Sequence, residues 1–260
     1  MLFTYTAGET TAPAIVFLHG GGLSGRMWQP QLEQLADYYC LAPDLPEQGK
    51  SVNEGPFNLD DTARRVVELI NERIPSRRAH LVGLSLGGAV ALNIMRIAPE
   101  TVDHVIVSGT AAGLGKVLGA ISKSSAVLYR FMKPETLVRV SVKQFGIPEA
   151  YQDMFREDIL LTSTEAFTRH FTDALMTMQL PCDSTIPTLV VVGEKETIPA
   201  KQAAKKLTNC LKQSRGVIVP GVGHVWNLQA PKLFAETVRA WITDSPLPGA
   251  LRPLASLVPR

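Results

Sequence analysis

Three side chains with the chemistry of a nucleophile, an acid and a base follow one another along this chain of 260 residues. Ser85 lies at the centre of the segment GLSLG, between an apolar run and a stretch of small residues. Glu196 and His224 come later, each after a further apolar run. A serine hydroxyl is a poor nucleophile until a base takes its proton, and that base needs an acid to orient it. The three residues in this order therefore predict acyl transfer through a serine.

The residues around Ser85 predict a sharp turn between a strand and a helix. Gly83 and Gly87 remove the side chains that would collide at such a corner, so the hydroxyl stays exposed there. A purely structural role for the small residues is the alternative, because they recur at strand–helix turns for packing reasons.

His224 is predicted to be the base because it follows the last apolar run on a G-x-G-H loop, from which its ring can reach the edge of a sheet. A histidine that caps the next helix is the alternative. Glu196 is predicted to be the acid, since it lies in the loop after the run at residues 188–192. Glu194 in the same loop is the second candidate, and a solvated charged loop accounts for the residues that are not used.

The segment HGGG at residues 19–22 predicts half of an oxyanion site. Two backbone N–H groups must face the developing charge, and we expect them from Leu86 and Gly21, with Gly22 as the alternative to Gly21. His19 is expected to shape this loop by hydrogen bonding. A phosphate-binding loop is disfavoured, because the segment is neither G-x-G-x-x-G nor followed by G-K-[ST].

Apolar runs that alternate with helical patterns position these residues. Runs at residues 14–18, 79–84, 102–107 and 188–192 have the length of buried strands, and they predict a mostly parallel, doubly wound sheet with helices on both faces. Residues 111–180 contain only helical patterns and are predicted to form a cap over the carboxyl edge of the sheet. Residues 1–110 and 181–244 form the core in this interpretation. Residues 245–260 form a tail outside the fold, whose last four residues resemble a tag remnant.

Composition narrows the class of protein. A hydrophobic fraction of 45% against 19% charged residues supports a large buried core, and a net charge of +2 argues against nucleic-acid binding. No signal peptide and no bilayer-spanning run is expected. The three cysteines are far apart and lack C-x-x-C spacing, so neither a zinc site nor a disulfide is predicted, and the location expected is a reducing cytoplasm.

At this point the chain resembles the α/β-hydrolase superfamily, in its small capped branch of esterases, carbon–carbon bond hydrolases and cofactor-free haloperoxidases. The motifs that carry the resemblance occur in family order: HGGG, DLPEQGKS at residues 44–51, VGLSLGG at 82–88, GEKETIP at 193–199 and GVGH at 221–224. The resemblance implies that Ser85 and His224 are nucleophile and base, that Gly21 and Leu86 form the oxyanion site, and that the cap follows the sixth strand of the fold. Two positions depart from the family: Glu196 stands where aspartate is usual, and the family's D-L-P-G-H-G-x-S segment is altered.

The function predicted from these observations is a serine hydrolase acting on a small or medium carboxylic ester, with no metal or organic cofactor. Cleavage of a carbon–carbon bond or a lactone by the same triad is the first alternative, and a non-catalytic ligand receptor is the second. Candidate substrate contacts are Gly22, Trp28, Phe131, Met132 and Met176, for most of which core packing is the competing interpretation. Basic residues of the cap, Arg130, Lys133, Arg139 and Lys143, could attract an acidic substrate or a carrier protein, although a solvated helix face is the simpler interpretation.

Overall fold

The computed structural model describes residues 1–115, 133–162 and 164–254. Among these residues, eight strands form one sheet in the order β1-β3-β2-β4-β5-β6-β7-β8. The strands are β1 (Thr4–Ala7), β2 (Ala14–Leu18), β3 (Tyr39–Pro43), β4 (Ala79–Leu84), β5 (Val102–Ser108), β6 (Thr188–Gly193), β7 (Ser214–Val219) and β8 (Arg252–Pro253). All neighbours from β3 to β7 are parallel, and only the edge strands β1 and β8 are antiparallel. The predicted mostly parallel sheet is confirmed.

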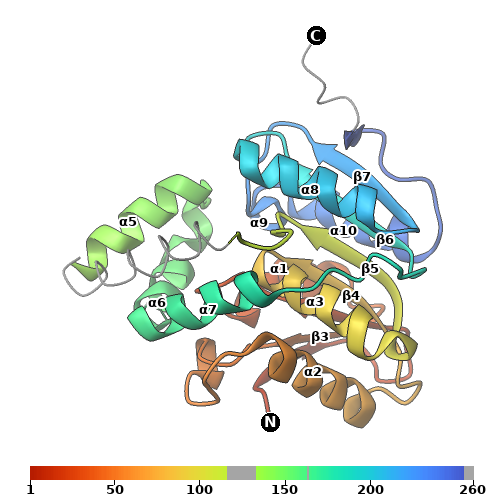
Figure 1. Ribbon diagram of the computed structural model, residues 1–260, viewed down its shortest axis with the longest axis horizontal. Helices are drawn as coiled ribbons and strands as arrows, with labels where there is room; N and C mark the ends of the chain where they lie inside the picture. The colour runs from red at the N-terminus through yellow and green to blue at the C-terminus, as the bar shows by residue number, and fades with distance from the viewer. Residues whose placement is uncertain (116–132, 163, 255–260) are drawn as a thin grey trace.

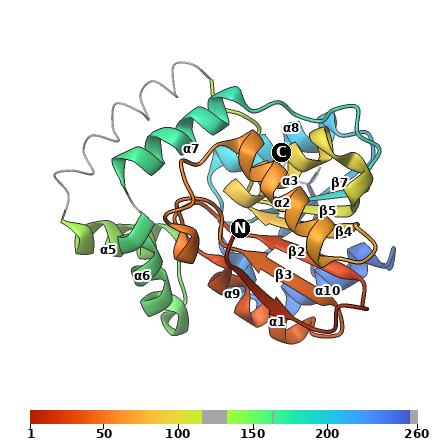
Figure 2. The same ribbon diagram turned by 90° about the horizontal axis from the view of Figure 1, so that it is seen from below.

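Helices cover both faces of this sheet (Figures 1 and 2). One apolar cluster joins α2, α3 and α8 to one face, and a second joins α1, α9 and α10 to the other. The bounds are α1 (Gln29–Gln34), α2 (Leu59–Arg73), α3 (Leu86–Ile97), α8 (Ile198–Cys210), α9 (Trp226–Gln229) and α10 (Pro231–Ile242), with short 3₁₀ turns at Gly25–Trp28, Gly49–Ser51, Pro99–Thr101 and Glu149–Tyr151.

The continuous apolar run in β2 reflects this double coverage. Val16 and Leu18 belong to the cluster under α2, α3 and α8, whereas Ile15 and Phe17 belong to the cluster on the opposite face. All four side chains are fully buried. Because successive side chains of a strand point to opposite faces, a strand covered on both faces has no polar positions and loses the alternating pattern.

The order of the central strands reverses at β2. β2 pairs with β3 on one side and with β4 on the other, so the chain runs outward from β2 and then crosses back. At such a reversal the loops that follow the two neighbouring strands part, and ligands bind between them. The HGGG loop follows β2 and Ser85 follows β4, so both lie at this reversal.

Three described helices lie between β5 and β6, namely α5 (Pro134–Phe145), α6 (Gln152–Thr162) and α7 (Glu165–Thr177). We call them the helical insertion. In Figure 1, α5 and α6 stand beyond the end at which β5 finishes. The predicted helices at 134–145 and 164–178 correspond to α5 and α7, while the helix predicted at 116–132 lies outside the described residues.

The structure corrects the prediction that no disulfide forms. Cys182 and Cys210 are bonded, with their Cα atoms 4.8 Å apart across 28 residues of sequence, and only Cys40 is a free thiol. The bond joins the segment before β6 to the last residue of α8. The assignment to a reducing cytoplasm rested on unpaired cysteines, so it loses its basis. Within the described residues, no helix is both long and apolar enough to cross a bilayer.

A second correction concerns the tail. The chain was expected to leave the fold at residue 245, but β8 pairs with β7 through Val217 and Ile218. Leu254 is 3% exposed and belongs to the core cluster under α8. This edge strand consists of one arginine and one proline, so it has no apolar pattern from which a strand could be predicted. The residues that resemble a tag remnant lie outside the described part of the chain.

Candidate active site

Ser85 occupies a strained turn between β4 and α3. Its φ of 53° and ψ of −111° lie in a region that non-glycine residues rarely adopt. A Cβ on Gly83 would approach the backbone of Gly87 to 2.5 Å, and a Cβ on Gly87 would come within 2.0 Å of the Leu18 carbonyl oxygen. The Ser85 N–H donates to the Ser108 carbonyl at 2.8 Å, which ties the turn to β5. The two glycines are therefore required for close approach, as the sequence predicted.

His224 and Glu196 meet across two neighbouring loops. Glu196 lies between β6 and α8, and His224 lies between β7 and α9. His224 Nδ1 and Glu196 Oε1 are 2.8 Å apart, with 20% of the histidine side chain and 6% of the glutamate side chain exposed. The loops are joined directly, because the Lys195 N–H donates to the Val222 carbonyl at 2.8 Å. A carboxylate so placed accepts the Nδ1–H and leaves Nε2 free for proton transfer.

Glu194 has a different role, which separates the two acid candidates. Its Oε2 accepts the Gly221 N–H at 2.8 Å and its Oε1 lies 3.2 Å from Arg252 Nη1. The side chain is 44% exposed. Of the two glutamates, Glu196 is the one that contacts the His224 ring.

Gly109 makes room for this pair, and the sequence analysis missed it. The residue follows β5 with a φ of +57°, and a Cβ there would lie 2.7 Å from the His224 ring and 2.8 Å from Glu196 Oε1. No role was predicted for the loop after β5, which contains no carboxylate. A glycine directly after a buried strand next to β6 was the signal that could have identified it.

An opening lies beside the His224–Glu196 pair. A cavity of about 640 Å³ is lined by both residues, by Phe145 at the end of α5 and by Thr197 at the start of α8. The Phe145 and His224 ring centroids are 5.3 Å apart. The helical insertion therefore contacts the predicted base directly.

The HGGG loop forms a tight turn across from Ser85. The Leu23 N–H donates to the Gly20 carbonyl at 3.3 Å, and Gly22 has a φ of +81°. The Gly22 N–H donates to Gln48 Oε1 at 2.8 Å, so it is already engaged, and Gly21 is the better candidate for the oxyanion site. Leu86 is the first residue of α3, where the N–H has no partner within the helix.

His19 orients the first peptide of this turn. The Leu45 N–H can only donate, so His19 Nε2 accepts it at 2.9 Å, and Nδ1 must carry the proton that it donates to the Gly20 carbonyl at 2.9 Å. Complete burial lowers the pKa of His19, which keeps the ring neutral in this tautomer. Because a peptide is planar and trans, holding the Gly20 C=O also fixes the direction of the Gly21 N–H.

The residues predicted to contact the substrate lie in different surroundings. Trp28 is fully buried and packs against Phe17 and Phe234, so it is a core side chain. Met176 lies on α7 and is half-buried. Phe131 and Met132 lie outside the described residues, as does Arg130.

The remaining histidines lie away from Ser85. His80 and His104 lie with tilted rings, their centroids 5.1 Å apart, near the starts of β4 and β5, at the opposite end of the sheet. His170 Nδ1 on α7 is 2.8 Å from Glu47 Oε2. Among the described residues, no group of three or more metal-binding side chains could hold a metal ion.

Comparisons with known proteins agree with this architecture. The alpha/beta hydrolase family matches residues 15–237. An AB hydrolase superfamily protein of Gibberella zeae is 28% identical over 94% of this chain and 85% of its own length. A pimeloyl-[acyl-carrier protein] methyl ester esterase of Pectobacterium carotovorum is 29% identical over 92% of this chain and 96% of its own. The crystal structure of an enol-lactonase from Burkholderia xenovorans superposes with a TM-score of 0.81 at 22% identity, covering 93% and 96% of the two chains.

Proposed function

Because this chain belongs to the alpha/beta hydrolase family, we propose that it is a serine hydrolase that cleaves a small or medium carboxylic ester. The observation that carries the proposal is the 2.8 Å contact between His224 Nδ1 and Glu196 Oε1. A ligand receptor on this fold needs no buried carboxylate against a histidine ring, whereas a serine hydrolase uses one to orient its base. The pair therefore supports catalysis rather than binding alone.

The first half of the proposed reaction acylates the enzyme. Ser85 Oγ bonds to the ester carbonyl carbon while its proton passes to His224 Nε2, and Glu196 stabilises the imidazolium. The carbonyl oxygen becomes an oxyanion that accepts hydrogen bonds from the N–H groups of Gly21 and Leu86. When the intermediate collapses, the bond to the alcohol oxygen breaks and that oxygen takes the proton from His224. The acyl group stays on Ser85.

The second half releases the acid. A water molecule gives its proton to His224 as its oxygen attacks the acyl carbon, and the same two N–H groups stabilise the new oxyanion. The bond to Ser85 Oγ then breaks, and the serine oxygen recovers the proton from His224. The products are one carboxylic acid and one alcohol, and the enzyme returns to its starting state.

The helical insertion acts as a substrate-selecting cap in this proposal. Phe145 of α5 packs near the His224 ring, and rings of Phe167 and Phe171 on α7 come within 3.6 Å of the Cβ position at Gly21. Apolar side chains of the insertion thus border both the base and the oxyanion loop. This supports an apolar acyl group as the part of the substrate that the cap encloses.

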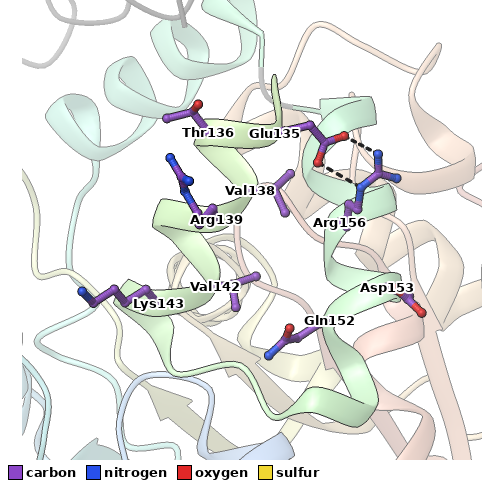
Figure 3. A pocket seen from close by; sticks show the side chains of 9 residues that line it. All are labelled: Glu135, Thr136, Val138, Arg139, Val142, Lys143, Gln152, Asp153 and Arg156. Atoms are coloured by element: carbon purple, nitrogen blue, oxygen red, sulfur yellow. Dashed lines mark hydrogen bonds and ion pairs between the residues drawn. The ribbon is translucent and has the colours of Figure 1, made fainter. Parts of the chain in front are cut away.

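The positive charges on the outer face of α5 support a second part of the proposal, namely that an acidic carrier protein delivers the ester. A groove of about 590 Å³ lies between α5 and α6. In Figure 3, Val138 points toward α6, whereas Arg139 and Lys143 are directed away from it. Glu135 and Arg156 bridge the two helices and neutralise each other. Neither Arg139 nor Lys143 forms an ion pair with another described residue, so both charges are free to attract an acidic surface.

Replacing Ser85 by alanine tests the proposed chemistry. The variant should lose several orders of magnitude in kcat for aryl esters, since no other nucleophile is available in the proposed mechanism. A panel of esters of rising chain length, with an enol-lactone and a β-diketone beside them, identifies the bond that is cleaved. Ester turnover by Ser85→Ala at the wild-type rate, or a serine-directed phosphonate that labels another residue, would refute the proposal.

The carrier is tested separately with a double variant, Arg139→Glu with Lys143→Glu. The KM for an ester linked to an acidic carrier protein should rise by about tenfold or more, because charge reversal at a docking surface slows association. The KM for the same ester without its carrier should not change. If the KM for the carrier-linked ester is the same in the double variant as in the wild type, docking on this face of α5 is ruled out.

A further inference from the structure

The HGGG turn depends on the direction of its central peptide, which joins Gly21 to Gly22. A hydrogen bond from the Leu23 N–H to the Gly20 carbonyl closes the turn, and a φ of +81° at Gly22 matches the third position of a type II turn. Type I and type II turns differ mainly in the direction in which this central peptide points. Glycine at the third position adopts both forms without steric cost, so the turn needs an external group to select one.

Gln48 is the group that contacts this peptide. Its side chain is fully buried, and its Oε1 accepts the Gly22 N–H at 2.8 Å. Its Nε2 is 3.5 Å from the Pro46 carbonyl, a long contact that orients the amide. If the central peptide turned over, the Gly21 carbonyl oxygen would face Gln48 Oε1, and two acceptors would meet in a buried site.

The adjoining peptide carries the candidate oxyanion donor. The Gly21 N–H belongs to the Gly20–Gly21 peptide, whose carbonyl is held by His19 Nδ1 and by the Leu23 N–H. Turning over the central peptide leaves the hydrogen bond from the Leu23 N–H to the Gly20 carbonyl in place, but it changes the ψ torsion of Gly21 and reverses the peptide dipole that adjoins the Gly21 N–H. His19 and Leu23 therefore hold the Gly20–Gly21 peptide, and Gln48 holds the central peptide that adjoins it.

We propose that Gln48 is a positioning residue for the oxyanion site, acting through the Gly22 N–H on the direction of the peptide dipole that adjoins the Gly21 N–H. This inference rests on the proposed function, because it assumes that an ester oxyanion forms next to Ser85. Gln48 itself touches no reacting atom. Its effect is expected in transition-state stabilisation, so it should appear in kcat rather than in KM.

The matched test replaces two buried glutamines by methionine, which keeps the side-chain length and has no amide, only a weakly accepting thioether sulfur. Gln48→Met removes the contact to the turn. Gln31→Met removes a comparable buried hydrogen bond, from Gln31 Nε2 to the Asn227 carbonyl at 2.9 Å, at a site outside the turn. Turnover of an aryl ester is measured for each variant and divided by the fraction of enzyme that a serine-directed phosphonate titrates, so that misfolded protein is not counted.

We expect Gln48→Met to lower kcat by about 10- to 100-fold with KM within about twofold, a smaller loss than the removal of an oxyanion donor. Gln31→Met should lower the Tm but leave the normalised kcat unchanged. Gln48→Glu keeps an acceptor at the same reach, so it should retain kcat within about threefold even though a buried carboxylate lowers the Tm.

The outcomes separate the inference from the function on which it rests. Wild-type kcat in Gln48→Met, or equal losses in Gln48→Met and Gln31→Met, would overturn the positioning role. If Gln48→Met yields no folded enzyme, Gln48→Glu decides: a kcat near that of the wild type supports the role, and a tenfold loss refutes it. Ester turnover by Ser85→Ala would overturn the proposed function itself.

Discussion

Neutralising the Glu196 carboxylate should disable the enzyme while leaving the fold intact. The substitution Glu196→Gln keeps the size of the side chain and an oxygen that can accept the His224 Nδ1–H. It removes the negative charge that lies 2.8 Å from that ring in a site where only 6% of the glutamate side chain is exposed. Glu194→Gln is the matched control, because that neighbouring glutamate is 44% exposed and contacts Gly221 and Arg252 instead.

The size of the loss follows from the distance. Two unit charges 2.8 Å apart attract by ~6 kcal/mol at an effective dielectric constant of ~20. The amide of Gln retains part of this through its neutral hydrogen bond, so a net loss of about 4 kcal/mol, or roughly 10³-fold in kcat, is expected. In Glu196→Asp the carboxylate withdraws by about 1.5 Å, and the attraction falls by about 2 kcal/mol, or roughly 30-fold.

The measurement is steady-state turnover of one chromogenic short-chain ester by the wild type and the three variants. The expected order of kcat is wild type and Glu194→Gln together, then Glu196→Asp, then Glu196→Gln. A loss below tenfold in Glu196→Gln would show that the carboxylate does not stabilise the imidazolium. Equal losses in Glu194→Gln and Glu196→Gln would show that the loop, and not one carboxylate, is required.

Three further predictions concern the surroundings of the site and the stability of the fold. Gly109→Ala should lower kcat by about 100-fold without preventing folding, because the new Cβ would lie 2.7 Å from the His224 ring; turnover normalised to phosphonate titration checks this. Burial lowers the pKa of His80 to about 4, so the unfolded chain binds the proton first, and the Tm should fall as the pH drops from 6.5 towards 4. His80→Phe should flatten that fall, and an unchanged slope would contradict the assignment. Reducing the disulfide made by Cys182, which closes a loop of 28 residues, should lower the free energy of unfolding by ~3–4 kcal/mol, and Cys182→Ser should no longer respond to the reductant.

The nucleophile turn and the central strands could be predicted because their causes are local. The Ser85 turn requires glycines on both sides, and β2 requires apolar residues at every position since helices cover both of its faces. Each of these requirements restricts the residue types at a few neighbouring positions, so it can be recognised in the sequence. The order of serine, acid and base then followed from the order of the strands along the chain.

The choice between the two glutamates could not be predicted from local patterns. Glu194 and Glu196 are two residues apart in one loop, and their directions depend on a turn in which the Glu196 N–H donates to the Gly193 carbonyl at 3.1 Å. The Gly221 N–H, on another loop, then engages Glu194. The same limit applies to the disulfide, since the packing of α8 on the sheet decides that Cys182 and Cys210 meet.

Gln48 shows the same limit for the oxyanion loop. Its segment departs from the family pattern, but no role could be predicted for Gln48, because a polar residue in a loop leaves no periodic signal. The contact to the Gly22 N–H joins residues 26 positions apart and becomes visible only when β2 and β3 lie side by side.

The pairing of β5 with β6 has a consequence for how such a chain can diversify. The two strands are parallel, with Thr188 opposite Val105 and Val191 opposite Ser108, so the long intervening segment leaves the carboxyl end of β5 and rejoins the sheet at the amino end of the adjacent strand. Strands that pair lie about 4.8 Å apart, and the entropy of closing a loop rises only slowly with its length. The segment between them is therefore exchangeable: a shorter, longer or unrelated helical block fits the same two attachment points. Under the proposed function, exchange of this segment changes the substrate range while the strands that precede Ser85, Glu196 and His224 keep their register.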